Sequence, residues 1–269
     1  MIMMKRIGLA LGGGGARGLC HIAFIRALEE TGYRPVIISG TSIGSLVGAF
    51  YAAGVGAEGM LNILEELDLG DINRMIDLSL RNKAGVIRGK GIEEFLRRYL
   101  PVRTFGELSI PLRVVATDLW NRREVVFDSG DLVAAIRASI SIPIIFEPLE
   151  LDGRILIDGG VLNPVPHDVI RRSCDILIAI DVSGGKEPPV DKLMPGMFES
   201  VLATFQIMQT AISQNRAQSS KVDIYIKPAL SGYRMLDFVK HKKIIESVKA
   251  DVENFKVTLR KKMRGWFFA

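Results

Sequence analysis

Two short stretches near the N-terminus decide the fold. Residues 6–18 read RIGLALGGGGARG and residues 36–44 read VIISGTSIG. In each stretch a short apolar run leads into a glycine-containing turn, and a segment whose apolar residues have helical spacing follows. This is the order strand, loop, helix. When this order repeats along a chain, it is typical of an α/β protein with a largely parallel sheet.

The rest of the chain continues this alternation. Further strands are expected at residues 112–118, 124–127, 154–158, 176–182 and 222–227. Helices are expected at residues 19–31, 43–53, 132–139, 197–215 and 239–264, with mixed helical sequence continuing from the second of them to Tyr99. Loops are expected at 85–91 and 183–195. No internal repeat or linker divides the sequence. We therefore predict a single α/β domain of three layers, α/β/α, with a mostly parallel central sheet.

The composition describes an ordinary globular protein. Of 269 residues, 48% are hydrophobic and 24% are charged, which excludes a disordered chain. The net charge of +5 fits anionic partners such as lipid head groups but selects none of them. Cys20 and Cys174 form no paired motif, so neither a disulfide framework nor a zinc site is predicted. With no secretory signal and no apolar run of roughly 20 residues, we expect a cytoplasmic protein, in solution or peripheral at a membrane.

The sequence Gly40-Thr41-Ser42-Ile43-Gly44 matches the G-x-S-x-G pattern of a nucleophilic serine. A serine at a sharp turn from strand to helix adopts strained backbone angles, and small neighbours leave room for that turn. The following helix directs free N–H groups and the positive end of its dipole at the place where an oxyanion forms. Because the pattern also occurs by chance, the flanking strand and helix carry much of the argument.

Four consecutive glycines at 12–15 follow the first strand and lead through Arg17 to Gly18. Without side chains, their N–H groups can converge on one anion. The run also fits the G-x-G-x-x-G dinucleotide pattern, but that pattern needs an acidic residue after the second strand, and the serine turn stands there instead. We interpret the run as an oxyanion hole, with a purely structural turn as the alternative. Its predicted donors are Gly13, Gly14 and Gly15, and Arg17 supports the loop or the anion.

A serine nucleophile needs a proton acceptor within hydrogen-bond reach. Histidine is the usual acceptor, and the chain contains only His21, His167 and His241. His21 and His167 stand near predicted helix starts, and His241 lies in a basic run. A surface or helix-end role explains each of them better than catalysis does.

Asp158 is the better candidate for the base. It ends a predicted strand, and Gly159 and Gly160 then let the chain turn away sharply. A carboxylate with an ordinary pKa of about 3.9 is a weak base, but an apolar pocket beside Ser42 would raise that pKa toward neutral pH. The rivals Asp118 and Asp181 also end predicted strands, where capping and loop hydrogen bonds explain them at least as well.

These motifs resemble, in their order, those of the patatin-like phospholipases: the glycine loop, the serine turn and the Asp158-Gly159-Gly160 turn. The likeness continues through RASISIP at 137–143, with Phe146 and Pro148 beyond it, and NPVP at 163–166. It covers roughly residues 5–228, which we predict to be a patatin-like phospholipase domain. Residues 229–269 are expected to form a basic helical extension packed on or near that domain.

The resemblance implies a dyad in which no histidine takes part, with Ser42 as nucleophile and Asp158 as proton acceptor. The expected reaction is hydrolysis of lipid acyl esters through an acyl-serine intermediate, as in phospholipases A, lysophospholipases and carboxylesterases, without a metal or other cofactor. The supporting residues are Arg17, Gly18, Gly40, Gly44, Gly159 and Gly160. Acyl transfer by the same dyad and a non-catalytic lipid-binding or regulatory module are the alternatives.

Two segments are candidates for contact with lipid. The predicted helix 197–215 has an apolar stripe that we expect to be core packing, with an acyl-binding wall as the alternative. The stripe consists of Phe198, Val201, Leu202, Phe205, Met208 and Ile212. The C-terminal RKKMRGWFF at 260–268 suits an anionic membrane surface as well as docking of its aromatics on protein. We expect a lipid ester as substrate and no nucleic acid partner, and the sequence predicts no oligomeric state.

Overall fold

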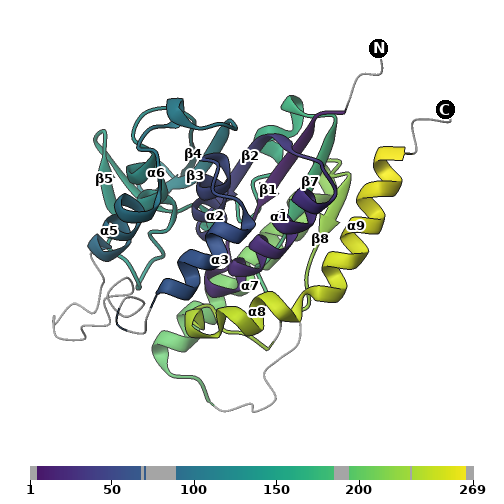
Figure 1. The fold of residues 1–269 in the computed structure, drawn as a ribbon. Helices are drawn as coiled ribbons and strands as arrows, with labels where there is room; N and C mark the ends of the chain where they lie inside the picture. The colour runs from purple at the N-terminus through teal and green to yellow at the C-terminus, as the bar shows by residue number, and fades with distance from the viewer. Residues whose placement is uncertain (1–4, 68–69, 71–88, 185–193, 231, 265–269) are drawn as a thin grey trace.

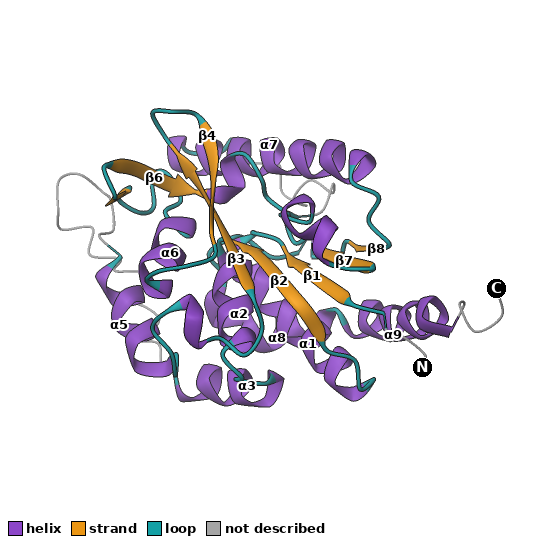
Figure 2. Cartoon of the chain, turned by 90° about the horizontal axis from the view of Figure 1, so that it is seen from above, coloured by secondary structure: helices purple, strands orange, loops and turns teal. Residues whose placement is uncertain are grey.

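The computed structural model describes residues 5–67, 70, 89–184, 194–230 and 232–264. It is a mixed α/β domain in which helices cover both faces of one central sheet, as predicted (Figure 1, Figure 2). The predicted loop at 183–195 lies mostly outside the described residues. The same holds for the first part of the loop at 85–91, whose second part already belongs to a helix.

The strands are β1 Ile7–Leu11, β2 Pro35–Thr41, β3 Leu112–Asp118, β4 Arg123–Phe127, β5 Leu149–Leu151, β6 Arg154–Asp158, β7 Ile176–Ile180 and β8 Ile224–Ile226. The α-helices are α1 His21–Glu30, α2 Ile43–Ala52, α3 Ala57–Glu66, α5 Lys90–Tyr99, α6 Leu132–Ser139, α7 Met197–Ser219, α8 His241–Ser247 and α9 Lys249–Arg264. Short 3₁₀ helices occupy Gly15–Cys20, Phe105–Glu107, Gly159–Val161, Asp168–Ser173 and Phe238–Lys240.

The sheet order brings the three predicted motifs together. The strands follow one another as β5-β6-β3-β2-β1-β7-β8, with β4 paired to β3, and the five strands from β3 to β8 run parallel. Leu11 pairs with Gly40, so the glycine loop after β1 and the serine turn after β2 leave the same edge. β6 is antiparallel to β3, and its last residue, Asp158, pairs with Ala116. Since Thr41 pairs with the adjacent Val115, the register alone places Asp158 beside the serine turn.

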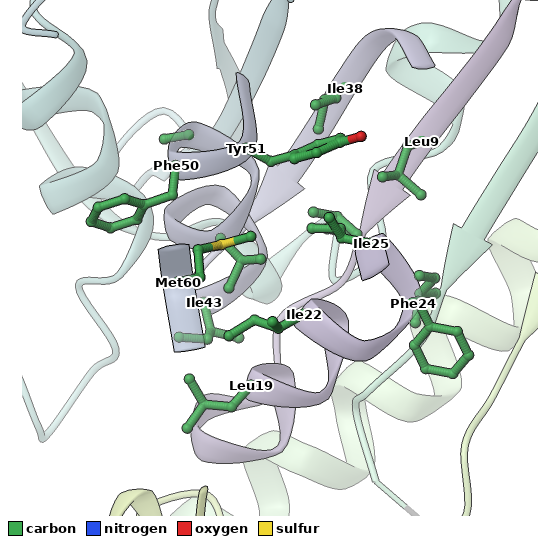
Figure 3. Close-up of a cluster of buried hydrophobic side chains, with 14 of the residues drawn as sticks. Leu9, Leu19, Ile22, Phe24, Ile25, Ile38, Ile43, Phe50, Tyr51 and Met60 are labelled. Atoms are coloured by element: carbon green, nitrogen blue, oxygen red, sulfur yellow. The ribbon is translucent and has the colours of Figure 1, made fainter. Parts of the chain in front are cut away.

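The main core lies between the sheet and one layer of helices. Helices α1, α2, α3, α8 and α9 lie on one side of the sheet and α7 on the other (Figure 2). Leu9, Ile25 and Ile38 are among the side chains from β1, α1 and β2 that meet in this core (Figure 3). Phe255 of α9 packs edge-on against Phe24 of α1, with ring centroids 5.8 Å apart. The C-terminal helices therefore share the core of the sheet domain.

The C-terminal helix and one strand differ from the sequence prediction. The helix predicted over 239–264 is divided at Val248, because α8 packs on the 3₁₀ helix Gly15–Cys20 while α9 packs on α1. The short strand β5 was not predicted, since three residues carry too little periodic signal. Among the described residues, no single helix is long and apolar enough to cross a bilayer, and only α2 and α3 together, bent by 120°, meet that length and composition.

The apolar stripe of α7 packs on the core only in part, which corrects the expectation for this helix. Phe198, Val201 and Met208 are 47%, 42% and 54% exposed, and within the stripe Leu202 and Phe205 pack partly against the core. The fully buried side chains of α7 are instead polar, Gln209 and Ser213. The helix meets the short turn after Asp158 through this polar side, so its apolar flank is left at the surface.

Candidate active site

Ser42 occupies the sharp turn between β2 and α2. Its backbone angles are φ 54° and ψ −127°, a region that non-glycine residues rarely enter. A Cβ on Gly40 would clash with the backbone of Gly44, and a Cβ on Gly44 would clash with the carbonyl of Leu11. Glycine is therefore required at both positions, and the turn has the geometry of a nucleophile elbow.

Ser139, at the end of α6, holds this turn in place. The backbone N–H of Ser42 donates to Ser139 Oγ at 2.8 Å, and that hydroxyl donates to the carbonyl of Val115 at 2.6 Å. Ser45 Oγ donates to the Ser42 carbonyl at 2.6 Å. Sequence reasoning assigned Ser139 no role, although it lies within the RASISIP stretch, because no spacing rule indicates which loop or helix end will cap an elbow.

Asp158 is buried at the same edge of the sheet, with 1% of its surface exposed. Oδ1 accepts a hydrogen bond from the Gly160 N–H at 2.7 Å. Burial raises the pKa of this carboxyl to about 7, and the nearby Ser42 hydroxyl partly opposes that rise. Among the described residues, Oδ2 has no well-formed hydrogen bond. The group is thus a carboxylate beside Ser42 that can take up a proton near neutral pH.

The two rival carboxylates are occupied elsewhere. Asp118 accepts from the backbone and side-chain amide of Asn121, at 3.0 and 2.8 Å, and these hydrogen bonds lower its pKa. Asp181 accepts from the Ser183 N–H at 2.9 Å and the Tyr225 hydroxyl at 2.7 Å. Both make the loop contacts that were the alternative explanation for them.

The glycine loop does not offer all three predicted donors. The Gly13 N–H already donates to the carbonyl of Pro164 at 2.9 Å, so Gly13 is corrected from an oxyanion donor to a brace of the loop. The N–H groups of Gly14 and Gly15 donate to no atom within the described part of the chain. Gly15 also lines the pocket that contains Ser42, and its φ of 59° favours glycine.

Two buried side chains support the loop from behind. Arg17 Nε donates to the Gly14 carbonyl at 3.2 Å, which fits the predicted supporting role. His21 Nε2 lies 2.9 Å from the Gly12 carbonyl, which can only accept, so this nitrogen carries the proton. Burial lowers the pKa of His21 to about 4, and the ring is neutral at physiological pH. The structure therefore places His21 as a buried brace, not at the surface.

The NPVP stretch at 163–166 clamps the elbow and the glycine loop together. Thr41 Oγ1 donates to the Asn163 carbonyl at 2.8 Å, and Ser39 Oγ donates to the Pro166 carbonyl at 2.7 Å. With the Gly13 bond to Pro164, three hydrogen bonds from β2 and the glycine loop end on this one segment. The sequence showed that the NPVP stretch resembles a family motif, but it did not predict that the stretch holds the serine turn and the glycine loop together.

An apolar pocket of about 110 Å³ opens at Ser42. Its walls come from the glycine loop, α2, α3, α5, the segment after α6, and the stretch before α8. The lining residues are Gly15, Leu19, Ser42, Ile43, Leu46, Leu64, Leu67, Ile92, Phe95, Ile140, Ile142, Ile145, Phe146, Met235, Leu236, Phe238 and His241. Within the described residues, no group of three or more His, Cys, Asp and Glu side chains is placed to hold a metal ion.

The fold and the site define an α/β protein with a serine elbow beside a buried carboxylate, and comparison with known proteins gives its family. The family model for patatin-like phospholipase matches residues 9–170, more than half of the chain. The chain belongs to the patatin-like phospholipase family, a family of lipid ester hydrolases.

Several relatives extend this result. An uncharacterized NTE family protein of Mycobacterium bovis is 41% identical over 193 residues, which cover 71% of this chain and 53% of that protein. Patatin-like phospholipase domain-containing protein 7 of Mus musculus is 29% identical, covering 91% of this chain and 20% of that protein. Lysophospholipase NTE1 of Kluyveromyces lactis is 29% identical, covering 90% of this chain and 18% of that protein. The chain thus spans about half of the first relative and about a fifth of the other two.

Two solved structures resemble the chain at 15% identity. The crystal structure of VipD from Legionella pneumophila matches with a TM-score of 0.47, covering 91% of this chain and 67% of that chain. The type III effector protein ExoU matches with a TM-score of 0.49, covering 97% and 54%.

Proposed function

We propose that this protein is a serine lipid acyl hydrolase that cleaves phospholipid or lysophospholipid esters through an acyl-Ser42 intermediate. The observation that carries the proposal is the pairing of a strained Ser42 with the buried Asp158 at the mouth of an apolar pocket. The family supports the substrate class, and the name of the fungal relative supports lysophospholipids in particular.

In the first half-reaction, Asp158 accepts the proton of Ser42 Oγ while that oxygen attacks the ester carbonyl carbon. The N–H groups of Gly14 and Gly15 stabilise the oxyanion, aided by the N-terminus of α2. The bond from carbon to the alcohol oxygen then breaks, and Asp158 returns the proton to the departing alcohol.

In the second half-reaction, water replaces the alcohol. Asp158 takes a proton from the water as its oxygen attacks the acyl-serine, and the carboxylic acid leaves as Ser42 regains its proton. A pKa near 7 lets one carboxyl perform both transfers at neutral pH, since each protonation state is well populated.

Contact with a lipid surface is part of this proposal. Phe198 and Met197, in the first turn of α7, are 47% and 87% exposed. Glu199 of that turn pairs with Arg234 at 4.0 Å, and Arg234 precedes Met235 and Leu236 of the pocket wall, so this ion pair links the start of α7 to the segment that lines the pocket. The aromatics at 266–268 lie outside the described residues, and their contact with a membrane stays a prediction, as does the cytoplasmic location.

The test is to incubate the purified protein with lysophosphatidylcholine and with diacyl phosphatidylcholine and to quantify free fatty acid by mass spectrometry. We expect fatty acid release that Ser42→Ala and Asp158→Asn abolish while both variants stay folded. Transfer of the acyl group to an added alcohol in preference to water would favour the acyltransferase. Binding to lipid vesicles without any release would favour the non-catalytic module.

A further inference from the structure

A second cavity lies on the helical face of the molecule, away from the sheet edge. It is a surface groove of about 570 Å³ between α1, α3, α8 and α9, the helices in front of the sheet in Figure 1. Its floor is apolar and is made by Ile22, Ala23, Ala27, Leu61, Leu64, Ile245 and Val252. An apolar groove of this size lies within the range of roughly 300–1,000 Å³ typical of small-molecule sites.

The charged rim of the groove offers no unpaired charge to a ligand. Lys242 pairs with Glu65 at 3.3 Å, and Lys249 pairs with Glu246 at 2.6 Å. Of the remaining rim residues, Arg26 pairs with Glu58. Glu30 and Glu253 both pair with Lys256. All seven charged lining residues thus have ionic partners, so the groove suits an uncharged apolar occupant better than a charged one.

The groove and the pocket at Ser42 share two wall residues, Leu64 of α3 and His241 of α8. Both side chains are only partly buried. His241 Nδ1 lies 3.3 Å from the Phe238 carbonyl, and its Nε2 has no hydrogen-bond partner among the described residues. Among the described residues, the contact of Nδ1 with the Phe238 carbonyl is the one hydrogen bond that the ring breaks if it moves aside. The two cavities therefore border the same two residues.

The pocket at Ser42 is too small to hold a long acyl chain on its own. At about 110 Å³ it falls below the range of ligand sites and leaves a long acyl chain largely in water. We propose that the acyl chain of the substrate starts at Ser42, passes between Leu64 and His241, and continues into the groove. The groove is then the subsite that selects chain length, an inference that rests on the proposed function.

Variants that fill the groove test this path by activity. Ala23→Trp places an indole on the groove floor, while Ala203→Trp, on the exposed side of α7, is the matched control. Each buried methylene is worth about a fourfold change in binding, so excluding even two of them exceeds tenfold. We expect the ratio of kcat/KM for p-nitrophenyl palmitate to that for the butyrate to fall at least about tenfold in Ala23→Trp only. An unchanged ratio in the folded variant overturns the inference.

Crosslinking in the unaltered protein tests the path without any substitution. A long-chain alkyl fluorophosphonate with a terminal diazirine is attached to Ser42 and irradiated, and the crosslinked peptides are identified by mass spectrometry. We expect crosslinks to groove residues that do not line the pocket at Ser42, such as Ala23, Ala27 and Leu61. Crosslinks confined to residues that line the pocket at Ser42 would overturn this inference and leave the proposed function intact. A protein that hydrolyses neither ester would instead refute the proposed function.

Discussion

The backbone N–H of Ser42 donates a hydrogen bond to the Ser139 hydroxyl, 2.8 Å away and 97 residues along the chain. The same hydroxyl donates to the Val115 carbonyl on β3, so one side chain joins the elbow to the strand that also pairs with the Asp158 strand. Ser42 and Asp158 are therefore both held against β3. Strained backbone at Ser42 persists because the surrounding contacts fix it.

Replacing Ser139 by alanine should damage both stability and turnover. A buried N–H left without its acceptor costs about 1–3 kcal/mol of unfolding free energy. Because small displacements of a nucleophile are costly, kcat should fall by roughly ten- to a hundredfold. Chemical denaturation and steady-state hydrolysis of p-nitrophenyl butyrate measure the two effects.

The matched control for Ser139→Ala is Ser213→Ala. Ser213 is equally buried, on α7, but its hydroxyl has no hydrogen-bond partner among the described residues. We expect this substitution to leave kcat within about twofold, since no polar group loses a partner. Equal losses of kcat in both variants would show that Ser139 does not position the elbow.

The pH dependence of hydrolysis should follow Asp158. Burial raises the pKa of its carboxyl to about 7, and only the ionised form can accept the proton of Ser42. For an activated ester, kcat/KM should rise about tenfold per pH unit below this value and level off above it. Asp118→Asn should retain the profile, while a half-point near the ordinary carboxyl pKa of about 4 would contradict a desolvated base.

The same carboxyl should make stability depend on pH. The folded state holds a proton on Asp158 up to about pH 7, whereas the unfolded chain releases it near pH 3.8. Between these values the folded state binds more protons, so stability falls as pH rises. Asp158→Asn removes the cost of burying an ionised carboxylate. The Tm of this variant should therefore exceed that of the parent protein by more at pH 8 than at pH 5. A Tm difference that is the same at both pH values would mean that Asp158 stays ionised throughout.

Gly15 should tolerate no side chain. Its φ is 59°, and a Cβ there would overlap with the backbone of Met235. Gly32 offers a matched control, because its φ of 76° is similar and nothing lies within 4 Å of the added atom. We expect Gly32→Ala to cost only about 1 kcal/mol of stability, from backbone strain. Gly15→Ala should in addition abolish hydrolysis. Equal activity in both variants would show that the loop at Gly15 plays no part in catalysis.

Much of the fold could be predicted from the sequence because most of its elements have strong periodicity. The bounds of β3, α6 and β6 agree with prediction residue for residue. The burial of α7 could not be predicted in the same way. Its polar Gln209 faces inward because Gly160, in the turn after Asp158, lies against it, a tertiary contact that overrides the apolar pattern.

The residues of the candidate site were easier to predict than their supports. Ser42 and Asp158 stand in motifs whose glycines are required by local geometry, so sequence spacing reveals them. Ser139 and His21 support the site through hydrogen bonds to backbone groups. Gly13 was predicted to be an oxyanion donor, but its N–H donates to the Pro164 carbonyl instead. Such contacts depend on where distant segments meet, which no local pattern encodes.

The most direct test of the central claim is covalent labelling of Ser42. The folded protein is treated with an alkyl fluorophosphonate, and the adduct is located by peptide mass spectrometry, with Ser42→Ala as the control. We predict one modified serine, Ser42, with labelling that slows below about pH 7 and is lost in Asp158→Asn. Unlabelled Ser42 in folded protein, or labelling that Asp158→Asn leaves unchanged, would contradict the Ser42–Asp158 dyad.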